Sequence, residues 1–191
     1  MSTQGTQPLP DNRRAALTLL GVCFAGALVA VSLGVYGRIH PPTGRPLALV
    51  IGFSSMTPMK AWLGTLAVVL ACFQVVSARI MWTTKPPSVL PTWVAVAHRW
   101  SGAIAFLLTL PVAYHCLWSL GFSSFDARTT IHSVAGCVVY GAFTSKMLAL
   151  RSRKISPRSL PVMGGLLFAA LITAWLTASL WYFTQSNVPL R

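Results

Sequence analysis

Acidic residues are almost absent from this chain. Its 191 residues include two carboxylates, Asp11 and Asp126, and charged residues of both signs make up 9% of it. A soluble domain carries about 25% charged residues, so this chain lacks the side chains needed to cover a water-facing surface. Hydrophobic residues make up 54% of the chain. We therefore predict an integral membrane protein that crosses its membrane several times.

Two kinds of motif are also missing. The cysteines, Cys23, Cys72, Cys116 and Cys137, form no C-x-x-C and no C-x-x-C-H sequence, which excludes the usual covalent attachment of haem. A buried cysteine usually behaves as a small hydrophobic side chain, and a place for Cys116 or Cys137 beside a cofactor is the alternative. No nucleotide-binding motif occurs. We therefore expect a subunit of a larger system and not a complete enzyme.

Basic residues dominate the charge, with 15 lysines and arginines and a formal net charge of +13. They flank apolar segments, so we attribute them to membrane topology and expect no nucleic-acid partner. On the predicted topology, one side of the membrane receives ten of them: Arg13, Arg14, Arg79, Lys85, Arg99, Lys146, Arg151, Arg153, Lys154 and Arg158. The other side receives five: Arg38, Arg45, Lys60, Arg128 and Arg191. Because the side richer in lysine and arginine faces the cytoplasm, we predict a cytoplasmic N-terminus and an external C-terminus.

The apolar segments are long enough to span a bilayer, which takes about 20 residues of helix. They predict transmembrane helices at about 15–36, 60–81, 92–120, 127–150 and 160–183. A polar tail, 1–12, precedes them, and 13–191 form a single transmembrane domain. The fold class is therefore all-α, an integral membrane bundle of five helices. Asp126 or Ser124 is the expected N-cap of the fourth helix.

Three of the four histidines, His98, His115 and His132, lie in or beside the apolar runs. An ionisable side chain at such a place suggests a function. His115 comes shortly before the end of the third predicted helix and His132 shortly after the start of the fourth, so each is roughly 8 Å inside the same, outer, end of the bundle. Two imidazoles on neighbouring helices can bind one haem iron from opposite faces. We predict His115 and His132 as the metal ligands of one non-covalent haem b.

Other residues near this end are candidates for cofactor binding. Gly136 lies one helical turn beyond His132 on the same face, where it leaves room for a porphyrin; close packing of two helices is the alternative. Arg38 and Arg128 are candidate partners of the haem propionates, or residues that only set the orientation. His40 is a candidate for contact with a propionate or a quinone, or an ordinary loop residue.

His98 does not fit the same haem. It lies 17 residues before His115, which is roughly 25 Å along a helix, near the cytoplasmic end. We expect an interfacial residue beside Arg99 and Trp100. The alternatives are a contribution to a quinone or partner site, or a second haem with Met147 or Met81 as its other ligand.

The stretch that holds these histidines contains the sequences HRWSG, YHCLWSLGF and HSVAGCVVYGAFTSKM. It resembles the transmembrane cytochrome b group, which includes ascorbate-reducible cytochromes b, bacterial low-potential cytochromes b and ferric-reductase-like domains. It is also similar to an uncharacterised actinobacterial membrane-protein family. The resemblance covers about 92–150 and implies a b haem held by His115 and His132. Two-haem members carry two histidines on each of two helices, and the fourth helix here has only one.

We expect a membrane electron-transfer subunit with one b haem near the outer face. Its partners are other membrane or extracytoplasmic redox subunits, a quinone and lipid. The first alternative is a haem-free accessory or assembly subunit of a membrane complex, in which the histidines join helices. The second is a transporter for haem or a metal, which is disfavoured because the chain has no intramembrane carboxylate and no obvious inverted repeat.

Overall fold

The computed structural model describes residues 12–44, 50–84 and 89–185. Apart from Asn12, the predicted polar tail lies outside these residues. So do three of the basic residues that entered the prediction of orientation: Arg45, Lys85 and Arg191.

The described residues form helices and no strand. The elements in chain order are α1 (Asn12–Ile39), α2 (Met56–Thr83), α3 (Thr92–His115), the π-helical turn η2 (Cys116–Leu120), α4 (Ala127–Arg151), α5 (Ser159–Trp175), the π-helical turn η3 (Leu176–Leu180) and α6 (Trp181–Gln185). Five continuous helices are long and apolar enough to cross a membrane, since η2 continues α3, and η3 and α6 continue α5. This confirms the predicted all-helical class and five spans. Polar residues such as Arg13 and Arg38 extend α1 beyond its apolar core.

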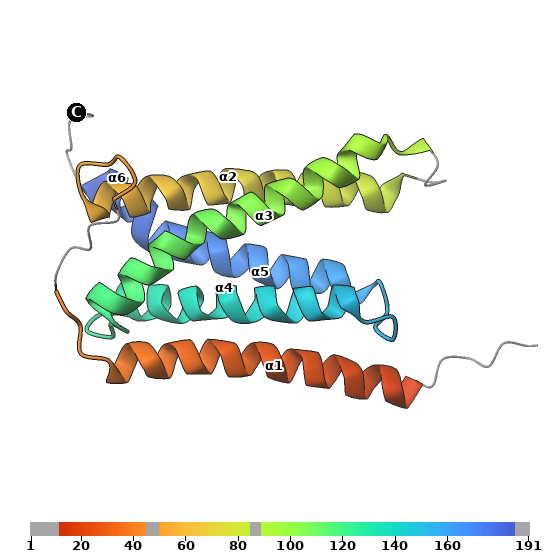
Figure 1. The fold of residues 1–191 in the computed structure, drawn as a ribbon, viewed down its shortest axis with the longest axis horizontal. Coiled ribbons are helices and arrows are strands. Elements are labelled where there is room, and N and C mark those ends of the chain that lie inside the picture. Colours follow the sequence, from red (N-terminus) through yellow and green to blue (C-terminus); the bar gives the residue numbers. More distant parts are fainter. Residues whose placement is uncertain (1–11, 45–49, 85–88, 186–191) are drawn as a thin grey trace, which may run out of the picture.

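The helices pack in the order α1, α4, α5, α2, α3. Figure 1 shows α1 and α4 lying along each other, while α3 runs diagonally across the bundle. It begins against α2, and its continuation η2 reaches α1. The start of α1 and the end of α6 lie at opposite ends of the bundle (Figure 1), as an odd number of spans requires.

Small residues bring α1 and α4 together. A Cβ added at Gly26 would collide with the backbone carbonyl of Gly141, and one at Gly141 would lie 2.9 Å from the Cβ of Ala30. One turn further, the Ser145 hydroxyl donates to the Val22 carbonyl at 3.2 Å. Lipid removes most of the hydrophobic gain from helix pairing, so close backbone approach and interhelical hydrogen bonds stabilise this contact.

The connection before α4 has a fixed geometry. The carboxylate of Asp126 accepts a hydrogen bond from the Thr129 backbone N–H at 2.7 Å, which confirms Asp126 as the N-cap. This hydrogen bond is the main reason that the pKa of Asp126 lies below its usual value. Gly121 has a φ of +68°, a conformation that glycine adopts without steric cost. The next residue, Phe122, donates its N–H to the Gly37 carbonyl at 2.7 Å and so joins the connection to α1.

The contact between α1 and α4 predicts the effect of a larger side chain. We expect Gly141→Leu to lower the free energy of unfolding by about 1–3 kcal/mol, the usual range for overpacking, because the new side chain must push α1 away. The control is Gly165→Leu on α5, where an added Cβ would meet nothing within 4 Å. Thermal unfolding in detergent micelles measures both variants. Equal stability of the two would contradict the close contact.

Candidate functional site

Two contacts fix how α3 lies against α4. The Tyr140 hydroxyl donates to the Thr109 carbonyl at 2.9 Å. The rings of Phe106 and Phe143 stack with centroids 3.9 Å apart and planes 8° from parallel. The two helices therefore run antiparallel and meet at these two contacts, where α3 crosses α4.

From this contact, the two predicted ligands lie toward the same end of the bundle. His115 is six residues after Thr109, roughly 9 Å along α3, and His132 is eight residues before Tyr140, roughly 12 Å along α4. Their depths therefore agree to within one helical turn. The two histidines thus lie at similar depths in the bundle. The binding of iron by these residues stays a prediction.

His132 is held by α5. Its Nδ1 lies 3.1 Å from the carbonyl oxygen of Ala174 and 3.2 Å from the Thr177 hydroxyl. A carbonyl oxygen only accepts, so Nδ1 carries the proton and Nε2 keeps its lone pair. Histidines that bind metals are commonly oriented in this way, with the second ring nitrogen bonded to a carbonyl or a carboxylate.

His115 is enclosed by protein. It is the last residue of α3 and its side chain has no exposed surface. The next residue, Cys116, interacts electrostatically with Lys60 of α2 and with Tyr140 of α4. His115 is therefore shielded from the surface at the point where α3 continues into η2.

Gly136 provides space on the same face of α4. It lies between His132, which bonds to α5, and Tyr140, which bonds to α3. A Cβ added at Gly136 would meet nothing within 4 Å. A flat cofactor needs both an oriented ligand and a face clear of side chains, and His132 with Gly136 meets these two conditions. The binding of a haem at this place stays a prediction.

Two cations lie near His132. Arg128 donates to the Thr177 carbonyl at 2.8 Å and places its guanidinium 4.0 Å from the centre of the Trp181 ring. Lys60, in the second turn of α2, interacts electrostatically with His132, as does Arg128. From the sequence, Lys60 is expected only to be one of the basic residues that set the orientation in the membrane. A lysine placed just inside an apolar segment was the signal that could have found it.

Arg38 and His40 belong to a different group. Together with the segment between η2 and α4, they line a pocket of about 360 Å³ at the end of α1. Arg38 Nη1 lies 3.5 Å from the Ser124 hydroxyl. The predicted set of propionate partners is therefore split, because Arg128 points to α5 and α6 while Arg38 and His40 lie on the α1 side.

His98 differs from the expected interfacial residue. Its Nδ1 lies 2.8 Å from the hydroxyl of Ser77, which is only 2% exposed. Gln74 of α2 donates to the carbonyl of His98 and, at 2.7 Å, to the hydroxyl of Ser101. The side chain is half-buried because α2 supplies these polar partners, whereas the neighbouring Arg99 and Trp100 are exposed.

The glycine that follows His98 is a packing residue. A Cβ at Gly102 would lie 2.9 Å from Gln74 Oε1, so the missing side chain makes room for Gln74. Lys146 of α4 is the cation that interacts with His98. Met147, proposed as an unusual second ligand there, is 40% exposed and turns away from the bundle interior.

A family of unknown function, DUF6529, matches residues 19–190. The chain belongs to the DUF6529 family. No curated protein and no solved structure matches it. The match covers the five long helices from Leu19 onward and includes the four histidines. The resemblance to cytochromes b stays an expectation.

Two further observations concern metals and thiols in this DUF6529 protein. Within the described ranges, no three residues among His, Cys, Asp and Glu come together as ligands for a metal ion. A haem needs fewer ligands from the protein, because the porphyrin itself supplies four of the iron ligands. All four cysteines are free thiols. Cys137 faces α1, since its Sγ lies 3.8 Å from where a Cβ on Gly34 would be.

The open face at Gly136 predicts how the expected haem responds to substitution. We expect Gly136→Leu to lose most of its haem, because the side chain fills the free face without meeting protein. Gly102→Leu should retain haem but unfold more easily, because it displaces Gln74. The haem-to-protein ratio and thermal unfolding of both purified variants test this. Wild-type haem content in Gly136→Leu would make Gly136 an ordinary helix glycine.

Proposed function

We propose that this protein is a membrane electron-transfer subunit that holds one b-type haem between α3 and α4, with His115 and His132 as axial ligands. The observation that carries the proposal is the bond from His132 Nδ1 to the Ala174 carbonyl at 3.1 Å. It leaves Nε2 as a lone-pair donor inside an apolar bundle, beside a glycine that no side chain covers.

The surrounding residues have separate roles in this proposal. Ala174 and Thr177 hold the His132 ring, and the complete burial of His115 keeps water from its ring. Lys60 and Arg128, which both interact electrostatically with His132, are the cations that we assign to the haem carboxylates. A bound haem supplies reversible one-electron transfer, at a potential set by its axial ligands, burial and hydrogen bonds.

A row of aromatic rings supports electron exchange at this end of the bundle. The centroid of His115 lies 6.1 Å from that of Tyr114, which lies 6.4 Å from that of Trp118. Trp118 is 4.7 Å from His40, and His40 is 5.1 Å from Tyr36. The row ends at Tyr36, and the rings of Trp118 and Tyr36 are both partly exposed. Electrons passing to or from a partner redox protein or a quinone have a short path here.

One observation favours the alternative of a haem-free accessory subunit. The same bond that orients His132 also joins α4 to α5, and His98 joins α3 to α2 in a similar way. Histidines that only connect helices would make these contacts too. Visible spectroscopy of the purified protein separates the two functions, because only a low-spin b haem gives sharp absorption bands on reduction.

Substitution of the histidines tests the ligand assignment. We expect His115→Ala and His132→Ala each to abolish the low-spin haem spectrum, because each removes one axial ligand. His98→Ala is the matched control: it breaks the bond to Ser77 and lowers stability, but leaves the reduced-minus-oxidised spectrum unchanged. Loss of the spectrum in His98→Ala with its retention in His115→Ala would overturn the assignment.

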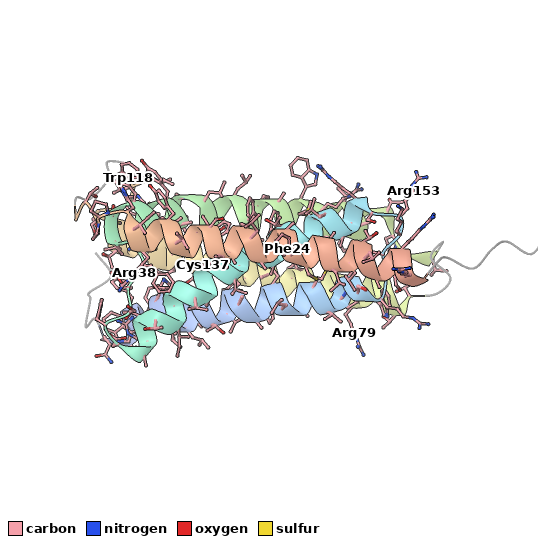
Figure 2. The ribbon with its side chains drawn as sticks, turned by 90° about the horizontal axis from the view of Figure 1, so that it is seen from below. Phe24, Arg38, Arg79, Trp118, Cys137 and Arg153 are labelled. Atoms are coloured by element: carbon pink, nitrogen blue, oxygen red, sulfur yellow. The ribbon has the colours of Figure 1, made fainter. Side chains whose placement is uncertain are left out.

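The distribution of arginines supports an orientation in the bacterial plasma membrane. Figure 2 shows Arg79 and Arg153 at one end of the bundle, and Arg38 with Trp118 at the other. Ten of the 15 lysines and arginines are assigned to the first end by the sequence. We propose that this end faces the cytoplasm, in accordance with the positive-inside rule, so that the haem lies near the outer face.

Reporter fusions test this orientation. A fusion at the N-terminus should be active only with a cytoplasmic reporter, and one at the C-terminus only with an external reporter, because five spans separate the two ends. Reversing both results would place the haem near the cytoplasm. Finding both termini on one side would contradict five spans.

A further inference from the structure

The pocket at the end of α1 is bordered by segments that are hydrogen-bonded to each other through the backbone. Thr43 donates its N–H to the Trp118 carbonyl at 3.4 Å, and Gly44 donates to the Ser119 carbonyl at 3.2 Å. These bonds tie the segment after α1 to η2. On the other side, a Cβ at Gly121 would lie 2.8 Å from the Gly37 carbonyl. The pocket of about 360 Å³ is therefore defined by backbone contacts and not by loose side chains.

The ring of His40 forms one wall of this pocket. The ring of His40 is stacked on Tyr36, with planes 14° apart, and against Trp118. Its Nε2 is buried and forms no hydrogen bond with the described residues. Because this nitrogen is buried, the His40 ring forms part of the pocket wall and does not itself reach a ligand.

The pocket also holds a positive charge that no carboxylate neutralises. Arg38 lines it, and its closest polar contact in the protein is the Ser124 hydroxyl at 3.5 Å. Asp126 is the single carboxylate of the described residues, and it is bonded to Thr129 and interacts with Arg128. Among the described residues Arg38 therefore has no carboxylate partner, so it is available to an anion from outside the chain.

We propose that this pocket binds a phosphate group. Arg38 supplies the charge and a forked donor, which suits tetrahedral oxyanions. The hydroxyls of Ser123 and Ser124 are the further hydrogen-bonding groups around the pocket, and the His40 ring forms part of its wall. The site lies at the end of a membrane-spanning helix, where phospholipid headgroups lie, and the phosphate comes either from such a lipid or from free phosphate. The proposal does not depend on haem.

The test uses native mass spectrometry of the full-length protein released from detergent. The probes are dioleoylphosphatidylglycerol and dioleoylglycerol, which carry the same acyl chains and differ in the phosphate headgroup, and inorganic phosphate. We expect the wild type to retain one phosphatidylglycerol and no dioleoylglycerol. Arg38→Gln should weaken retention roughly tenfold, since one charge-assisted hydrogen bond is lost. Arg79→Gln, an exposed arginine at the opposite end (Figure 2), should bind as the wild type does.

A second variant separates loss of binding from loss of folding. Ser124→Ala, at an exposed position, removes a hydroxyl of the pocket without disturbing the packing of the helices, and it should also weaken retention. If inorganic phosphate displaces the lipid and binds alone, the natural ligand is free phosphate; if it does not, the ligand is a lipid. The proposal is overturned if Arg38→Gln and Arg79→Gln weaken binding equally, or if the wild type retains neither phosphate nor phosphatidylglycerol in preference to dioleoylglycerol.

Discussion

Polar contacts between helices determine which helices touch in this bundle. In lipid, burying one more leucine between two helices gains little, because the acyl chains are as apolar as the leucine. Each helix pair is accordingly joined by groups that lipid cannot satisfy. His98 bonds to Ser77 between α3 and α2, and Trp175 donates to Thr65 at 2.9 Å between α5 and α2. Where α1 meets α4, the missing side chains of Gly26 and Gly141 allow the backbones to approach. The helix order follows from these few contacts.

The two π-helical turns lie at the same end of the bundle, and both touch the candidate site. The turn η2 follows His115 directly, and η3 contains Thr177, which contacts His132 and accepts from Arg128. A π-helical turn interrupts the regular i→i−4 ladder and frequently occurs at functional sites. Here η2 also presents its carbonyls to the segment after α1. The turn η2 thus contributes both to the surroundings of His115 and to one wall of the proposed phosphate pocket.

The fold was predictable because its signal is local, while the grouping of the site residues was not. Composition and the length of the apolar runs suffice for five spans, and an aspartate before a helix suffices for the N-cap at Asp126. The direction in which a side chain leaves its helix depends on crossing angles that no single segment encodes. Arg38 and Arg128 therefore looked equivalent in sequence, although one lies on the α1 side and the other against α5. Lys60 looked in sequence like a residue that only sets the orientation in the membrane. The residues it interacts with, Cys116 and His132, are far from it along the chain.

The two His-x-x-x-Gly sequences show most clearly what tertiary structure adds. At His98 and Gly102, α2 lies close enough for Gln74 to occupy the place of the missing side chain. At His132 and Gly136, α3 crosses α4 diagonally and no protein atom lies within 4 Å of that place. The same five-residue pattern is thus a helix contact at one end and an uncovered face at the other. The proposed haem at His132 therefore rests on this difference in packing between the two histidines, and not on the motif.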